Sequence, residues 1–247
     1  MPQPLILVGP HESAPPAPLM QPSTSGYLHL AAVVDPPRQP GPPFPRPSAR
    51  RSLLLSRLPT LARGLDAHPD VQRTTIYRAV LVPPAPRGQG VAAARADVVV
   101  LVETVSPERT GGVQASAAYQ SLTTALAEVA REVHVTTAGC LRRVAEVDKT
   151  RPGLFLFNYF TAPDAAVAVQ LWERLAGWYA AHTGLDNSTV LAPTGETDFV
   201  FVNHARWDTS LPRFLARQFL KRSFWTFVRA NLNANRVVAR PVLYRLA

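Results

Sequence analysis

Apolar and polar residues follow a regular pattern along the second half of the chain, which predicts four strands and two helices. The run DFVFVNHARW (198–207) is mostly apolar on both faces through its middle, as in a strand that is covered on two sides, and the earlier run GLFLFNYF (153–160) also predicts a strand. The helix after it stops before Gly184, a residue suited to the left-handed position that closes a helix. A second helix begins near Pro212 and breaks near Lys221. The predicted order is strand 153–160, helix 164–182, strand 187–191, strand 198–207, helix 212–232 and strand 237–246.

The first half has the same order with weaker patterns. A leucine stripe from Leu54 to Leu65 predicts a helix, which Pro59 kinks or splits. A later stripe from Tyr119 to Val129 predicts the second helix of this half. The predicted order is strand 26–35, helix 48–67, strand 74–82, strand 97–105, helix 114–130 and strand 133–144.

Two consecutive βαββαβ orders indicate an α+β protein built from two tandem ferredoxin-like repeats, at 26–150 and 151–247. Each sheet has helices on one face only, so the two bare faces are expected to pack together as an intrachain pseudo-dimer. A ligand would then lie between the sheets. Strands 154–160 and 199–207 should be neighbours in one sheet, and the other sheet should contain 98–104.

Proline is concentrated at the N-terminus, where residues 1–47 hold 14 of the 25 prolines. Proline lacks the amide donor that a sheet needs, so most of this region cannot join one. We therefore expect a Pro-rich tail at 1–25 and an extended loop at 36–47, with no regular structure at 10–22 or 36–47.

Composition limits the classes of function. At 47% hydrophobic residues the chain suits a globular protein, and no apolar run reaches the roughly 18 residues of a membrane helix, so we expect no membrane partner. One cysteine, Cys140, excludes an intrachain disulfide and fits the reducing cytoplasm. The net charge of +9 comes mainly from dispersed arginines without a basic helix, which favours an anionic small ligand over nucleic acid.

The stretch DFVFVNHARW at 198–207 carries the best candidate site. Strand alternation puts Asn203 and Trp207 on one face, and we expect Phe199, Phe201, Asn203 and Trp207 to face the gap between the repeats. The amide and the indole N–H would then donate hydrogen bonds to a substrate oxyanion, with the phenylalanines as apolar walls. A structural interpretation stays open, in which Asn203 bonds a neighbouring backbone group and Trp207 plugs the barrel end.

Two further residues are candidates. His204 is a general-base candidate because an imidazole titrates near neutrality, although alternation places it with Val200 and Val202 toward the helices. Asn158 lies on the strand expected beside 199–207 and would share the pocket. His182, late in a helix, fits the helix dipole better than haem ligation.

The second repeat resembles the dimeric α/β-barrel superfamily, most closely its antibiotic-biosynthesis monooxygenase branch. The resemblance covers about residues 153–247 and rests on LFNYF (156–160), LWERLAGWYAAHTGL (171–185) and FVNHARWD (201–208). Quinone-forming monooxygenases of that branch use an asparagine and a tryptophan spaced like Asn203 and Trp207. Their tyrosine a little downstream is absent here, where Arg213 is nearest.

The resemblance implies a cofactor-independent monooxygenase, or a related cyclase, that acts on a hydrophobic aromatic or polyketide-like small molecule in secondary metabolism. The haem-degrading branch has an asparagine comparable to Asn158, but its haem-ligating histidine has no counterpart after Trp207. A haem-binding enzyme of the same superfamily and a non-catalytic binding protein remain the alternatives. A homo-oligomer is compatible with each of them.

Overall fold

The computed structural model describes residues 4–9, 16–38, 41–84 and 90–247. Its strands are β1 (Gly26–Val33), β2 (Val71–Leu81), β3 (Val98–Thr104), β4 (Glu132–Ala145), β5 (Leu154–Thr161), β6 (Ser188–Pro193), β7 (Phe201–Trp207) and β8 (Val238–Leu246). Its α-helices are α1 (Ala49–Asp66), α2 (Thr110–Ala115), α3 (Ala117–Val129), α4 (Ala165–Thr183), α5 (Leu211–Phe219) and α6 (Ala230–Ala234). Shorter turns are the 3₁₀ turns η2 (Ala92–Arg95) and η3 (Pro107–Arg109) and the π-helical turn η4 (Phe224–Arg229).

The eight strands form one closed antiparallel barrel in the order β1-β3-β2-β8-β5-β7-β6-β4. Each half of the chain supplies four neighbouring strands, and the β2–β8 and β4–β6 pairs join the two halves. The predicted neighbours are confirmed, because β5 pairs with β7 from Leu154↔Trp207 to Phe160↔Phe201. Strand β3 lies in the other half, also as predicted. Closure leaves no free sheet edge, which removes the unpaired backbone groups of an open sheet.

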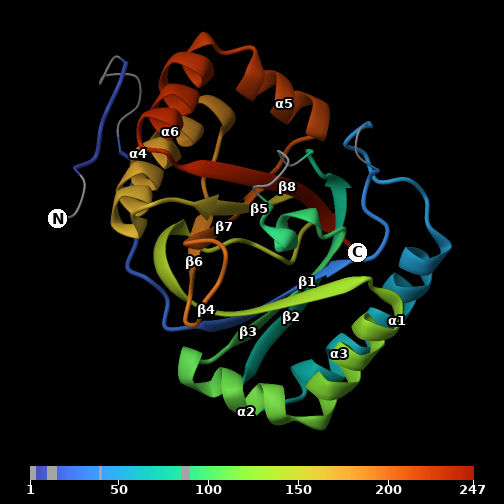
Figure 1. Ribbon diagram of the computed structural model, residues 1–247. Helices are drawn as coiled ribbons and strands as arrows, with labels where there is room; N and C mark the ends of the chain where they lie inside the picture. Colours follow the sequence, from blue (N-terminus) through green and yellow to red (C-terminus); the bar gives the residue numbers. More distant parts are fainter. Residues whose placement is uncertain (1–3, 10–15, 39–40, 85–89) are drawn as a thin grey trace.

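Helices cover the outside of both halves (Figure 1). Helices α1 to α3 pack on the first half, and α4, α5, η4 and α6 pack on the second. Pro59 does not split α1, which runs unbroken. The helix predicted over 114–130, in contrast, is divided at Ser116 into α2 and α3. Ser116 caps α3 by accepting a hydrogen bond from Tyr119 N. The predicted break near Lys221 is confirmed, since α5 ends at Phe219 and η4 begins at Phe224.

The described part of the Pro-rich regions follows the prediction. Residues 16–22, 36–38 and 41–47 contain no helix or strand beyond a single bridge between Met20 and Arg143; residues 10–15 and 39–40 lie outside the described residues. Residues 4–9 run beside η4 and α6, where Asn231 and Asn235 bond the backbone of Val8 and Ile6. Among the described residues, no helix is both long and apolar enough to cross a membrane.

Helix α4 closes as its sequence predicts, and the glycine that follows its last residue provides a stability test. Gly184 has φ 77°, in the left-handed region that disfavours side chains with a Cβ. We expect Gly184→Ala to lower the free energy of unfolding by about 1 kcal/mol. The matched control is Gly64→Ala inside α1, where a Cβ meets nothing within 4 Å and alanine should stabilise the helix. Urea denaturation of both variants checks the opposite signs, and equal effects would contradict the prediction.

Candidate functional site

From Phe201 onward, the side chains of β7 point to the opposite faces of the sheet from those predicted. Val202 packs in the aromatic core of the barrel, and His204 contacts Tyr77 there. Phe201 packs with the helix layer, as does Trp207. The prediction that Phe201, Asn203 and Trp207 face the barrel interior is therefore wrong, and so is the placement of Val202 and His204 toward the helices.

The start of the strand explains the reversed phase. Residues 198–200 form a bend, and the ladder begins only at Phe201. Phe199 points into the barrel as predicted, but Val200 and Phe201 both pack on the helix side. This break in the alternation shifts every following side chain to the other face. The predicted site is thus divided, with Phe199 and His204 inside and Phe201, Asn203, Asn158 and Trp207 outside.

Two asparagines face the helix layer side by side. Asn158 on β5 and Asn203 on β7 are register partners, so their side chains lie on the same face. Ser188 Oγ donates a 2.6 Å hydrogen bond to Asn203 Oδ1, which leaves the amide Nδ2 of Asn203 turned away from Ser188. Asn158 Oδ1 is buried without a partner among the described residues. Buried orphan acceptors are rare in native proteins, so this pair is a candidate ligand contact.

The asparagine pair lies between two apolar clusters. One contains Phe160 and Phe201, and the other contains Leu156 and Trp207; the ring of Tyr179 on α4 packs against both. Strand β5 has neighbours on both sides, yet Asn158 is partly exposed. Solvent must therefore reach Asn158 through the helix layer. Burial raises the pKa of Tyr179 above its ordinary value, so its phenol stays protonated.

Trp207 is oriented by the helix layer. Its indole Nε1 donates a 3.0 Å hydrogen bond to Thr183 Oγ1 at the end of α4, and its ring lies 4.7 Å from that of Phe214 on α5. The indole N–H is therefore engaged with the protein. Trp207 can supply an aromatic wall, but its predicted role as an oxyanion donor requires Thr183 to be displaced.

Inside the barrel, two histidine–tyrosine pairs join the halves of the chain. His204 Nε2 lies 3.2 Å from the Tyr77 hydroxyl, and His29 Nε2 lies 3.3 Å from that of Tyr159. His204 Nδ1 is 3.0 Å from Leu156 O, which can only accept, so Nδ1 carries the proton and Nε2 accepts from Tyr77. The ring of His204 also stacks on that of Phe157 at 4.2 Å.

Both interior histidines are held neutral. Burial lowers the pKa of His29 to about 4. Burial, followed by the charge of Lys149, holds the pKa of His204 well below its ordinary value. A neutral imidazole whose Nε2 already accepts from Tyr77 is a weak general base, and the sheet separates it from the asparagine pair. His204 therefore cannot act as the general base for a substrate bound at Asn203.

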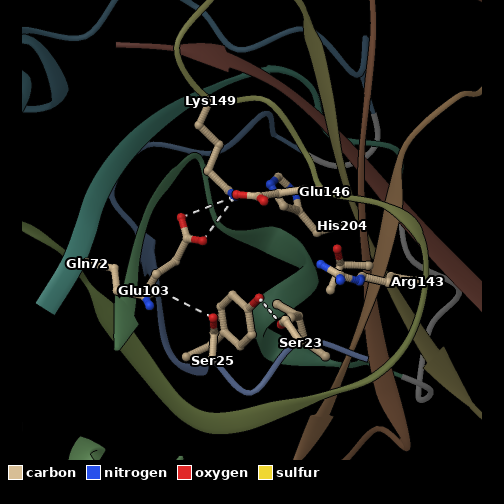
Figure 2. Close-up of a pocket in the computed structure, with 11 residues that line it drawn as sticks. Ser23, Ser25, Gln72, Glu103, Arg143, Glu146, Lys149 and His204 are labelled. Carbon is tan, nitrogen blue, oxygen red and sulfur yellow. Dashed lines mark hydrogen bonds and ion pairs between the residues drawn. The ribbon is translucent and has the colours of Figure 1, made fainter. Parts of the chain in front are cut away.

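A cavity of about 330 Å³ opens at one end of the barrel (Figure 2). Its lining is mostly polar and includes two carboxylates and two cations, so it matches a small polar molecule better than an aromatic ring. Burial raises the pKa of Tyr27, in its wall, to about 12. The lining residues are Ser23, Ser25, Tyr27, Gln72, Glu103, Arg143, Glu146, Lys149, Thr189, Leu191 and His204.

A buried ion pair lies among the residues that line this cavity. Lys149 Nζ lies 3.1 Å from both carboxylate oxygens of Glu103 and donates to Val147 O at 3.0 Å. The two side chains are only 5% and 9% exposed. This pair was not among the residues predicted from the sequence, although Glu103 is the one carboxylate within the apolar run VVVLVET and Lys149 is one of two lysines. A lone charge in a buried-strand pattern signals a buried partner.

Haem does not fit the helix layer of the second half. Among the described residues, the helical histidine nearest to this layer is His182, whose ring stacks on Trp178 at 4.7 Å and whose Nδ1 bonds Trp178 O. The two apolar clusters of this layer flank the asparagine pair. Haem requires an axial iron ligand, and the ring of His182 is instead stacked on and hydrogen-bonded to Trp178 of its own helix, so we derive no chemistry through haem.

Comparisons with known proteins show likeness of fold. No protein-family model and no curated protein sequence match the chain. Similar solved structures include an anthrone oxidase-like protein (TM-score 0.62, 14% identity, 90% of this chain and 91% of that one). Others are a proposed monooxygenase from Fusobacterium nucleatum (0.59, 5%, 91% and 93%) and a mutant chlorite dismutase from Candidatus Nitrospira defluvii (0.52, 10%, 93% and 94%). The predicted duplicated ferredoxin-like, dimeric α/β-barrel fold is confirmed.

Proposed function

We propose that this protein is a cofactor-independent oxygenase that acts on a hydrophobic, aromatic or polyketide-like small molecule. The site we assign is the helix-facing side of β5 and β7. The observation that carries the proposal is the in-register pair of Asn158 and Asn203 between two apolar clusters. An apolar layer that contains two amide groups suits an ionisable phenol or enol, whose oxyanion needs hydrogen bonds as it forms.

In this reaction the chain stabilises charge. Ser188 fixes Oδ1 of Asn203, so Nδ2 is free to donate to the substrate oxyanion. Asn158 supplies the second amide from the facing strand. No side-chain base is assigned, and the substrate proton leaves to solvent through the opening at Asn158. A related cyclase would use the same two amides to stabilise an enolate.

An anthrone is the first probe, chosen from the fold neighbour described as anthrone oxidase-like. Loss of the proton from the methylene carbon gives an enolate whose oxygen faces the two amides. The carbanionic carbon then adds dioxygen, and the resulting peroxide anion takes a proton back from solvent to form a hydroperoxide. Loss of water from the hydroperoxide gives the anthraquinone, so one anthrone and one O₂ yield one quinone and one water. Trp207, Phe201 and Leu156 would contact the rings.

We expect Asn203→Ala to reduce anthrone-dependent oxygen consumption about 100-fold, the low end for the loss of one oxyanion donor. The folded fraction should change little, because water can replace a pocket-facing amide. Oxygen uptake by protein purified with a chelator, without added flavin or metal, is the measurement. Urea denaturation of the same samples separates turnover from stability.

The matched control is Asn187→Ala, at the residue directly before β6. Asn187 bonds both N and O of Arg206 and also donates to Asp186 Oδ1, so its amide is engaged with the protein. This variant should lose stability but keep its turnover per folded molecule. If wild-type protein does not accelerate oxygen uptake, or Asn203→Ala unfolds while its folded fraction stays fully active, the proposal is wrong. A Soret band in the purified protein would favour the haem alternative.

A further inference from the structure

Although basic residues are dispersed along the chain, its net positive charge is concentrated near the C-terminus. Residues 209–247 contain eight arginines and lysines and no aspartate or glutamate, so they account for eight of the nine net charges. Five of these cations, spread over α5, η4 and the turn between them, are exposed: Arg213, Arg217, Lys221, Arg222 and Arg229. None of the five forms an ion pair with another described residue.

Three large apolar side chains are exposed within the same segment. Leu220 is 84% exposed, Trp225 is 53% exposed and Phe219 is 43% exposed. They belong to one surface, because the rings of Phe219 and Trp225 lie 6.1 Å apart and Trp225 Nε1 donates to Phe219 O. Leu220 directly follows Phe219. We call these three residues, with the five cations, the α5–η4 surface; it lies on the outside of the barrel (Figure 1).

We propose that the α5–η4 surface docks on an anionic lipid surface. Basic residues beside exposed tryptophan and leucine are typical of segments that lie in the membrane interface, where apolar side chains enter the acyl boundary and cations bind headgroups. This departs from the sequence-based expectation of no membrane partner, which concerned spanning segments. The assignment does not depend on the oxygenase proposal.

The charge of this surface and its exposed apolar side chains argue against two other binding partners. A second copy of the chain bound through the same surface would bring ten exposed cations together, and like charges across an interface repel. Nucleic acid would bind the cations, but it offers no apolar phase for Leu220, the most exposed large apolar residue described. An anionic lipid surface satisfies both the cations and the apolar side chains.

The test is co-sedimentation of the full chain with vesicles at low salt, using phosphatidylcholine alone or with about 30 mol% phosphatidylglycerol. We expect partition onto the anionic vesicles only. Lys221→Glu changes the charge by two and should weaken partition about tenfold or more. Leu220→Ser should weaken it about tenfold through the lost apolar contact.

The matched controls lie on α1, at the other side of the barrel. Leu53→Ser removes another exposed leucine, and Arg63→Glu makes the same charge change at an exposed site. Both should bind like the wild type within about twofold, since neither lies on the docking surface. Circular dichroism confirms that each variant is folded.

Several results would overturn the proposal. The first is that the protein does not bind vesicles at all, and the second is that it binds neutral and anionic vesicles equally. The third is that the α1 control variants lose as much vesicle binding as the Leu220 and Lys221 variants. If the protein binds a DNA duplex but no vesicles, and Leu220→Ser leaves the DNA binding unchanged, the surface would be assigned to nucleic acid instead. Concentration-dependent dimerisation that Leu220→Ser abolishes, without vesicle binding, would assign it to a second copy.

Discussion

The free energy of unfolding should fall by about 2 kcal/mol between about pH 7.5 and about pH 5 through His29 alone. The reason is the buried neutral ring, whose pKa in the folded protein is about 4, compared with 6.5 in the unfolded chain. Below pH 6.5 His29 becomes protonated in the unfolded chain but stays neutral in the folded protein. The stabilisation is therefore complete above pH 6.5 and is lost as the pH falls toward 4. His204 adds a loss of the same sign.

Urea denaturation followed by tryptophan fluorescence at the two pH values measures this effect. His29→Gln and His204→Gln keep a hydrogen-bonding group near Tyr159 and Tyr77 but cannot be protonated, so the double variant should show a much flatter pH dependence. His134→Gln is the control, because this histidine is partly exposed on β4 and lies outside the barrel core. An unchanged pH dependence in the double variant would refute the assignment.

Breaking the Glu103–Lys149 pair should cost more than any single exposed charge. Lys149→Met leaves the carboxylate of Glu103 buried without a cation, which costs about 3–5 kcal/mol. Replacing both residues by methionine should restore most of this loss, because no uncompensated charge remains. The two effects together give a double-mutant cycle, again measured by urea denaturation at neutral pH.

The surface pair Arg57–Glu128 is a matched control with a similar contact distance of 2.9 Å and far greater exposure. Its Arg57→Met variant should lose less than about 1 kcal/mol. Additive losses in the Glu103 and Lys149 cycle, or a loss at Arg57 as large as that at Lys149, would show that burial does not decide the strength of this pair.

Local pattern was enough to predict the order of elements. Asp164 caps α4 through the N–H groups of Ala166 and Val167, and Gly184 ends it in the left-handed conformation. Signals of this kind act within one turn of helix, so they are legible in a single sequence. The β5–β7 pairing also followed, because two ferredoxin-like repeats leave few alternatives for their central strands.

The candidate site depended on information that the local pattern does not contain. Both faces of β7 are buried, so alternation along 201–207 carries no sign of which face meets the barrel and which meets the helices. Only the bend at 198–200, set by its packing in the closed barrel, decided that phase. The contacts of His29 with Tyr159 and of Lys149 with Glu103 likewise join residues far apart in the chain, and closure of the barrel alone brings them together. The sequence by itself determined the helices, the strands and their order; the tertiary structure decided which buried polar groups meet, because burial on both faces erases the periodic signal.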